Sequence, residues 1–191
     1  MKRLLIVGAG GHGRSVAEAV LVGGVFQLMG FVDDAAAQTR QVWQWPVLGS
    51  TAELIHCRQH AEAAIVAIGN NALREALQAR LCAAGFEIAT VVHPQAMVSP
   101  SASLGAGCAV MAGAIVGTEA RLGQGVIVNS GAVVDHHCQV DSFGHLGTRV
   151  AMAGGSALGQ GAWMQAGAVL GYGVKVVPGV VLGPGTALSA Q

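Results

Sequence analysis

The sequence predicts two domains: a small parallel α/β sheet with helices, followed by an all-β parallel helix built from short repeats. Three observations lead to this fold class. Strand-like and helix-like segments alternate over residues 1–93, as they do in parallel α/β sheets. From Val98 to Leu188 every sixth residue is aliphatic or methionine, without a slip in register. Glycine makes up 29 of the 191 residues and charged residues only 10%, a composition that favours a repeat architecture over an ordinary globular domain.

The elements of the first domain follow from the apolar pattern and from the residues that interrupt it. We expect strands at residues 3–7, 28–32, 63–68 and 88–92, and helices at residues 13–21, 51–57 and 72–84. Asp33 ends the second strand, Gly85 stops the last helix, and the His93-Pro94 pair ends the fourth strand. Residues 43–48 are expected to form a turn region. The first domain is therefore placed at residues 1–94 and the second at residues 95–191.

The period of six in the second domain predicts one short strand and one corner in each hexapeptide. The aliphatic side chains are expected to fill the axis of a prism, and small residues such as Cys138 fit where a corner crowds them. Glycine tolerates the backbone angles that the corners need, and successive coils would pair like neighbouring strands, about 4.8 Å apart. The sixteen axial positions are Val98, Leu104, Val110, Val116, Leu122, Val128, Val134, Val140, Leu146, Met152, Leu158, Met164, Leu170, Val176, Leu182 and Leu188.

Composition narrows the possible partners and the compartment. With 10 basic and 10 acidic side chains the formal net charge is zero, which argues against a nucleic acid or an anionic membrane as partner. No apolar run reaches the ~20 residues of a membrane span. The first run, Leu4–Val7, stops at Gly8 and is too short for a signal peptide. The four cysteines lack the spacing of a zinc site, so we expect reduced thiols, no metal and a cytoplasmic protein.

The glycines near the start of the chain predict a site for a phosphate-containing ligand. Gly8, Gly10 and Gly13 form a G-x-G-x-x-G pattern between the first strand and the first helix, and Asp33 follows about 20 residues later, as in dinucleotide-binding folds. A helix N-terminus binds anions, and glycine permits close approach. Because only about 90 residues precede the repeats, roughly half of a full dinucleotide-binding domain, we favour the pyrophosphate of a sugar nucleotide, with NAD as the alternative.

Charged and titratable side chains are rare in the repeats, so one histidine cluster stands out. Asp135, His136 and His137 are consecutive, and His145 lies nine residues after His136. Because histidine titrates near pH 6.5, it is the natural group to accept a proton at neutral pH. Cys138 adjoins the cluster and raises nucleophilic catalysis as an alternative. Its place at the small inward position of its hexapeptide favours a packing role instead.

Four motifs together resemble a known family: Val7–Gly13, Ile68–Asn71, His93-Pro94 and Val134–Cys138. They are similar to motifs of the left-handed β-helix acyltransferases of bacterial surface-sugar synthesis, which include nucleotide-aminosugar N-acetyltransferases and sialic-acid O-acetyltransferases. The resemblance covers nearly the whole chain. It implies a Rossmann-like first domain and a left-handed parallel β-helix with three hexapeptides per coil, and thus five coils. It also implies acetyl-CoA as co-substrate, a sugar nucleotide as acceptor, and a homotrimer.

The resemblance assigns roles to particular residues. His136 matches the general base of the family, and Asp135 lies beside it. Because Cys138 is assigned a packing role, we expect direct transfer of the acetyl group. The glycine loop and the acidic pair suit a nucleotide-linked acceptor, so we expect transfer to an amino group. His145 is implied to lie near the donor thioester, where it could stabilise the developing oxyanion. Contacts with the acceptor are implied for Gly10, Gly11, His12, Asp33, Asp34, Asn70 and Asn71. We also expect contacts with acetyl-CoA from Asn129, His145, Gly154 and Gly155, the last two through their backbone amides.

The chain departs from the family pattern at one catalytic position. The residue after the base is usually Asp or Glu, which orients the imidazole, and here it is His137. Asp135 could take over this task. Since His136 and His145 are half a coil apart, we expect them on opposite sides of the prism, so that a shared active site would need two subunits. The alternatives are O-acetylation of a sialic-acid-type sugar and a sugar-nucleotide binder with weak or no turnover. A zinc-dependent carbonic anhydrase is disfavoured because the spacing of its three histidines is absent.

Overall fold

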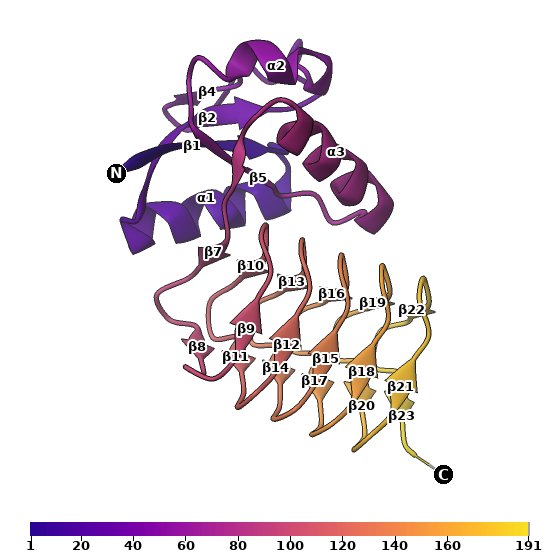
Figure 1. The fold of residues 1–191 in the computed structure, drawn as a ribbon. Helices are drawn as coiled ribbons and strands as arrows, with labels where there is room; N and C mark the ends of the chain where they lie inside the picture. Colours follow the sequence, from indigo (N-terminus) through magenta and orange to yellow (C-terminus); the bar gives the residue numbers. More distant parts are fainter. Residues whose placement is uncertain (191) are drawn as a thin grey trace. The chain divides into compact units, whose positions relative to one another are not determined.

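The computed structural model describes residues 1–190 and divides into two compact units, Met1–Val91 and a second unit that begins at Val92 (Figure 1). In the first unit, four parallel strands form a sheet in the order β2-β1-β5-β6. Their bounds are β1 Lys2–Val7, β2 Phe26–Val32, β5 Ala63–Val66 and β6 Glu87–Ile88. The consecutive residues Leu4–Val7 of β1 are all fully buried, as expected for a parallel strand that is covered on both faces.

Helices cover the two faces of this sheet. The helix α1 (Gly11–Gly23) packs against β1 and β2, and α3 (Asn71–Ala83) packs against β5 and β6. A 3-10 turn, η1 (Thr51–Glu53), leads into the short α2 (Leu54–Cys57), which lies next to α3. Leu5 and Val7 share one core cluster with residues of α2 and α3, so the alternating Leu4 and Ile6 face α1. None of the helices within residues 1–190 has the length and apolar composition that crossing a membrane requires.

For the first unit, one expectation was incomplete and one was wrong. The expected turn region contains a small antiparallel hairpin of β3 (Gln41–Val42) and β4 (Trp45–Pro46), which the Trp45 indole ties to β2 by donating to the Leu28 carbonyl. The single strand expected at residues 88–92 is divided: β6 ends at Ile88, and Val91–Val92 (β7) pairs in a sheet of the second unit. A short apolar run shows that a strand is present but does not show which sheet it joins.

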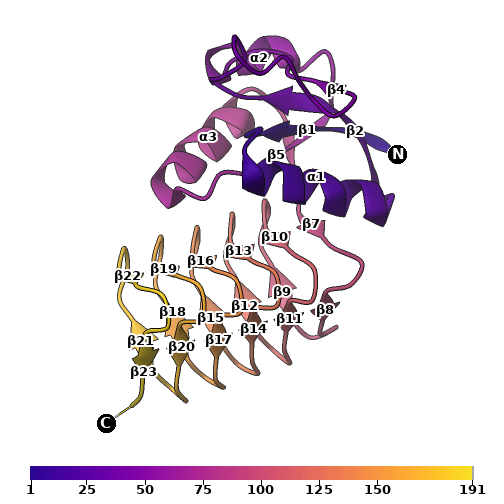
Figure 2. The same ribbon diagram turned by 180° about the vertical axis from the view of Figure 1, so that it is seen from behind.

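The second unit is a left-handed parallel β-helix of about five coils (Figures 1 and 2). Each strand pairs in parallel with the strand 18 residues further on, as Ile127 pairs with His145 and Val133 with Ala151. The strands form three faces. Face 1 contains β7 Val91–Val92, β10 Ala109–Val110, β13 Ile127–Val128, β16 His145–Leu146, β19 Trp163–Met164 and β22 Val181–Leu182. Face 2 contains β8 Met97–Val98, β11 Ile115–Val116, β14 Val133–Val134, β17 Ala151–Met152, β20 Val169–Leu170 and β23 Ala187–Leu188; face 3 contains β9 Ser103–Leu104, β12 Arg121–Leu122, β15 Gln139–Val140, β18 Ala157–Leu158 and β21 Lys175–Val176.

The axial residues pack as the period of six predicts. Val134, Leu146, Met152 and Leu158 are at most 1% exposed and belong to one apolar cluster. Cys138 is also buried, and its thiol lies within hydrogen-bonding distance of the Ala153 carbonyl, which agrees with the packing role expected for it.

The corners explain the glycine content of the second unit. One residue in each turn adopts a positive φ, and this residue is usually glycine, as at Gly155, where φ is 69°. Non-glycine residues take this conformation at only four corners among residues 92–190: Glu119, His137, Phe143 and Arg149. A left-handed conformation costs a non-glycine residue roughly 1–2 kcal/mol. A charged or titratable side chain at such a corner therefore indicates a structural or functional role that offsets this cost.

Candidate functional site

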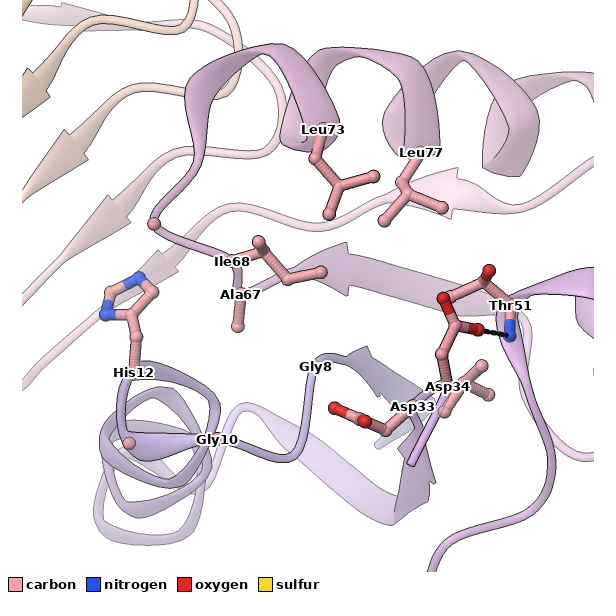
Figure 3. A pocket seen from close by; sticks show the side chains of 13 residues that line it. Gly8, Gly10, His12, Asp33, Asp34, Thr51, Ala67, Ile68, Leu73 and Leu77 are labelled. Carbon is pink, nitrogen blue, oxygen red and sulfur yellow. Dashed lines mark hydrogen bonds between the residues drawn. The ribbon is translucent and has the colours of Figure 1, made fainter. Parts of the chain in front are cut away.

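The first unit has a cavity at the carboxyl ends of its central strands. The chain leaves β1 for β2 on one side and places β5 on the other side of β1, which creates the switch point where open α/β sheets bind ligands. The cavity has a volume of about 360 Å³, and its walls follow β1, β2 and β5 (Figure 3). It is lined by Gly8, Gly10, Gly11, His12, Val32, Asp33, Asp34, Thr51, Ala67, Ile68, Gly69, Leu73 and Leu77.

The glycines of the loop before α1 have two different tasks. A Cβ on Gly8 would lie 2.8 Å from the Ala67 carbonyl oxygen, and one on Gly13 would overlap the Gly8 carbonyl, so both glycines permit close packing. Gly10 and Gly11 have open space where a Cβ would be, and both line the cavity. The first turn of α1 has no acidic residue, and its N-cap, Gly10, offers no side chain. Unsatisfied N–H groups at this end therefore face a ligand space suited to an anion.

Two carboxylates brace the walls of the cavity. Asp33 accepts hydrogen bonds from the backbone N–H groups of Ala9 (2.7 Å) and Ala35 (2.8 Å). Asp34 accepts one from the Thr51 N–H at 2.8 Å, drawn as a dashed line in Figure 3. Each carboxylate oxygen keeps a second lone pair, so these contacts leave room for a ligand hydroxyl or N–H. The predicted acceptor contacts of Asp33 and Asp34 remain predictions, but the structure adds a structural task for both.

His12 lines the cavity from the first turn of α1, on the opposite side of it from Asp33 and Asp34 (Figure 3). Burial, and secondarily the positive charge of Arg74, lower the pKa of His12 from 6.5 to about 4. Its Nε2 atom is buried and has no hydrogen-bond partner within residues 1–190. The imidazole is therefore neutral at pH 7, and its Nε2 atom is a polar group that a bound ligand can satisfy.

The Asn70-Asn71 pair organises the start of α3. The Asn70 side chain accepts a hydrogen bond from the Leu73 N–H (2.9 Å) and caps the helix. The Asn71 side chain accepts one from Arg74, whose guanidinium is fully buried and also donates to the Ile68 carbonyl at 2.9 Å. Neither asparagine lines the cavity, so their contact with an acceptor stays a prediction. The sequence reasoning missed Arg74, although an arginine on the apolar face of a helix was a usable signal.

In the second unit, His136 stands at the corner between β14 on face 2 and β15 on face 3 and is exposed. Its imidazole lies against Gly154, one coil further on. A Cβ at Gly154 would approach the His136 Nε2 to 2.5 Å and Nδ1 to 3.0 Å. The Gly155 N–H donates to the His136 carbonyl at 3.0 Å. Gly154 thus provides the space for the ring, and Gly155 ties the two coils together. Their predicted contacts with acetyl-CoA stay predictions.

Two side chains lie near the ring nitrogens of His136, and a third side chain contacts one of those two. The Nδ1 atom is 2.9 Å from Nδ1 of His137, and Nε2 is 3.8 Å from a carboxylate oxygen of Asp135. The other oxygen of Asp135 accepts the backbone N–H of His136 at 2.7 Å. The Nε2 atom of His137 lies 3.1 Å from the carboxylate of Glu119, one coil before it. The sequence reasoning missed Glu119, although its separation of 18 residues from His137 was a usable signal.

His145 lies on face 1, whereas His136 stands at the corner between the other two faces. The His145 ring stacks on Trp163 with centroids 5.2 Å apart and planes 11° from parallel, and it is 7% exposed. Asn129 follows β13 on the same face, and its side chain accepts the Ser130 N–H at 2.9 Å. A single chain therefore does not bring His145 together with His136. Among residues 1–190, no three His, Cys, Asp or Glu side chains are grouped so as to hold a metal ion.

Comparisons with known proteins agree with both units. Residues 3–81 match the family model of the PglD N-terminal domain. The structure of PerB, a GDP-perosamine N-acetyltransferase from Caulobacter crescentus, in complex with CoA and GDP-perosamine, is 36% identical over 98% of this chain and 89% of that chain, with a TM-score of 0.93. The acetyltransferase domain of PglB from Neisseria gonorrhoeae, in complex with acetyl coenzyme A, is 34% identical over 99% of this chain and 96% of that chain, with a TM-score of 0.76.

A curated relative has a related name. The UDP-N-acetylbacillosamine N-acetyltransferase of Bacillus subtilis is 32% identical over 114 residues, which are 59% of this chain and 52% of the relative. This match therefore spans about half the length of the relative. The similarity to PerB and PglB extends over nearly all of this chain and most of theirs. The chain belongs to the family of left-handed β-helix N-acetyltransferases that act on nucleotide-linked amino sugars.

Proposed function

We propose that this chain transfers the acetyl group of acetyl-CoA to the amino group of a sugar linked to a nucleoside diphosphate. The observation that carries the proposal is the similarity, over 98% of the chain, to a structure that contains both CoA and GDP-perosamine. Two features of the structure support the proposal: a cavity suited to an anionic nucleotide and an exposed imidazole on the β-helix. We assign the acceptor to residues 1–94, and acetyl-CoA and catalysis to residues 95–191.

The cavity of the first unit suits the nucleotide part of the acceptor. The pyrophosphate would lie at Gly10 and Gly11, where the N–H groups of α1 are unsatisfied and no Cβ blocks the approach. Asp33 and Asp34 would accept hydrogen bonds from the nucleoside through their remaining lone pairs. His12 would pair with a polar group of the ligand through the Nε2 atom of its half-buried, neutral imidazole. Asn70 and Asn71 would contribute through the backbone that they hold at the start of α3.

The histidines of the second unit suit direct acetyl transfer. The amine nitrogen attacks the thioester carbonyl carbon and forms the C–N bond, and His136 Nε2 takes the proton that the nitrogen loses. The C–S bond then breaks, and CoA leaves as a thiol that carries the proton returned by the imidazole. Asp135 would stabilise the transient imidazolium from 3.8 Å. His145 would stabilise the oxyanion, and Asn129, Gly154 and Gly155 would border acetyl-CoA.

The faces of the β-helix support the expected homotrimer. The outward residues of face 2 are apolar, and several are well exposed, such as Met97 at 68% and Val169 at 40%. The outward residues of face 3 include Arg121, Gln139 and Lys175. An exposed apolar row beside a polar one marks face 2 as a surface for self-association.

A thiol-release assay tests the proposed function. The purified chain is incubated with acetyl-CoA and, in separate reactions, GDP-perosamine, UDP-linked amino sugars and free sialic acid. We expect CoA release with a nucleotide-linked amino sugar and an increase of one acetyl group in the mass of that sugar. His136→Ala should lower kcat by about two to four orders of magnitude, the usual contribution of a general base. Release with sialic acid alone would favour O-acetylation. Tight binding of the sugar nucleotide without turnover would instead support the alternative of a sugar-nucleotide binding protein.

A further inference from the structure

We infer that Glu119 and His137 are positioning residues that hold His136 in the tautomer required of a general base. The three side chains form a continuous chain, from the Glu119 carboxylate through the His137 imidazole to the His136 imidazole. This inference rests on the proposed acetyl transfer, in which His136 takes a proton. It assigns to a glutamate in the preceding coil the orienting task that an acidic residue directly after the base would otherwise perform.

These contacts favour one arrangement of the protons. A carboxylate only accepts hydrogen bonds, so the His137 Nε2, 3.1 Å from Glu119, must carry a proton. In neutral His137 the Nδ1 atom is then an acceptor. The His136 Nδ1 lies 2.9 Å away and must supply the proton between the two rings. The second nitrogen of His136, Nε2, is consequently left with a free lone pair, which is the form that accepts a proton from an amine.

The backbone conformation of Glu119 and His137 is energetically unfavourable, which supports a functional role for these two residues. Glu119 and His137 have φ values of 57° and 58°, at a corner type that glycine occupies in most other turns, including Gly155 in the coil after His137. Two successive coils therefore carry strained non-glycine residues whose side chains contact each other. Strain of this kind points to function when the strained groups lie beside reactive ones.

The remaining neighbours of His136 leave Nδ1 to His137. Asp135 lies on the Nε2 side, at 3.8 Å, and uses its other oxygen to accept the His136 backbone N–H. Gly154 supports the ring from the next coil without a side chain. Asp135 is thus placed to interact with the imidazolium after proton transfer, whereas Glu119 and His137 determine the tautomer before it.

The tautomer can be measured without any substrate. The full-length protein is labelled with ¹⁵N-histidine, and the ring ¹⁵N shifts of His136, assigned with His136→Ala, are recorded at pH 8. We expect wild type to show a protonated Nδ1 and an unprotonated Nε2. Glu119→Gly, which introduces the residue usual at these corners, should produce a mixture of both tautomers. Arg149→Gly is the matched control, because it removes a charged residue from an equivalent corner with φ of 56°. An unchanged His136 tautomer in Glu119→Gly would overturn the inference.

Kinetics separate positioning from structural support. With the acceptor identified by thiol release, Glu119→Gly should lower kcat about tenfold, as loss of a partner that orients a histidine does, and leave both KM values within about twofold. His137→Glu places a carboxylate next to the base, so in that background Glu119→Gly should no longer lower kcat. A similar loss of kcat in both backgrounds would overturn the inference. If no amino sugar is acetylated by wild type, the proposed function fails, while the ¹⁵N shifts still decide whether the chain of contacts exists.

Discussion

The His136 imidazole fits against the next coil because Gly154 has no side chain. A Cβ there would come within 2.5 Å of Nε2. The backbone of Gly154 does not have the positive φ of its neighbour Gly155, so alanine is tolerated by the main chain. The exposed ring, rather than the coil, has to move. The spatial requirement at Gly154 is therefore imposed by His136 and not by the fold.

Gly154→Ala is expected to lower kcat at least tenfold while changing the free energy of unfolding by less than about 1 kcal/mol, because only a surface side chain is displaced. Gly161→Ala is the matched control. Gly161 has φ of 63° and open space at its Cβ, so alanine there should cost about 1 kcal/mol of stability and leave kcat unchanged. Urea unfolding and initial rates check both. Normal kcat in Gly154→Ala would contradict the role of the His136 ring position.

His12 makes the stability of the protein depend on pH. Burial, and then the positive charge of Arg74, lower its pKa from an ordinary value of 6.5 to about 4 in the folded protein. Between these two values the unfolded state binds a proton that the folded state does not, so the free energy of unfolding falls as the pH falls from 6.5 to 4. The contribution of His12 is present above pH 6.5, and about 3 kcal/mol of it is lost on reaching pH 4.

His12→Gln should remove this part of the pH dependence. Urea unfolding at pH 7, 5.5 and 4.5 is compared for wild type and variant. We expect the stability difference between them to shift in favour of the variant as the pH falls, by up to about 3 kcal/mol. A difference that is constant over this range would show that His12 titrates normally in the folded protein.

At the scale of elements, the loop between β1 and α1 is held against the end of β2 by Asp33, through the Ala9 N–H at 2.7 Å. At the other end of β1, Glu62 accepts the Arg3 N–H at 3.0 Å and pairs with the Arg3 guanidinium. Both carboxylates fasten the same strand. Of these two carboxylates, only Asp33 lies at the cavity. Substitution of Glu62 therefore tests the loss of a contact to β1 alone, whereas substitution of Asp33 also affects the ligand site.

Asp33→Ala should raise the KM for the nucleotide-linked acceptor at least tenfold, since a charge-assisted hydrogen bond contributes about 1.5–3 kcal/mol, and leave the KM for acetyl-CoA unchanged. Glu62→Ala should leave both KM values unchanged. Steady-state kinetics with each substrate varied in turn provide the measurement. If Asp33→Ala instead weakened the binding of NAD and not of the sugar nucleotide, the first unit would be a dinucleotide site.

At the scale of the whole molecule, the period of the β-helix separates the two histidines that we propose as catalytic. One coil contains 18 residues, as the pairing of Ile127 with His145 shows, and His145 lies nine positions after His136. Half a coil leads from the corner between faces 2 and 3 to face 1. Two imidazoles so placed serve one reacting carbon only if they come from neighbouring subunits, as threefold packing of the prisms would allow.

A mixing experiment tests this shared site. His136→Ala and His145→Ala chains, each inactive alone, are unfolded and refolded together. In the proposed trimer, mixed assemblies would contain some interfaces with both histidines intact, so part of the activity should return. Native mass spectrometry of one isotopically labelled variant shows whether subunits have exchanged. If exchanged mixtures stay inactive, His136 and His145 do not act together across an interface.

Much of the fold could be predicted because its signals are local or strictly periodic. The axial residues from Val98 onward repeat every six positions, and the structure buries them along one axis. The pattern Gly8, Gly10 and Gly13 predicted a loop between strand and helix, and the loop is found between β1 and α1. The hairpin at Gln41–Pro46 was missed because its strands have two residues each, too few to show an alternation. The strand at residues 88–92 was misassigned because pairing partners are not local.

The sequence by itself determined the architecture, the family resemblance and the candidates His12, Asp33 and His136, since residue type and spacing are enough to recognise a repeat or a motif. Only the tertiary structure decided what these side chains contact. It showed that Asp33 braces the glycine loop, that Arg74 is buried near His12, and that Glu119 reaches His137 from the preceding coil. The physical reason is that hydrogen bonds and pKa shifts depend on distances of a few ångströms between residues far apart in the chain.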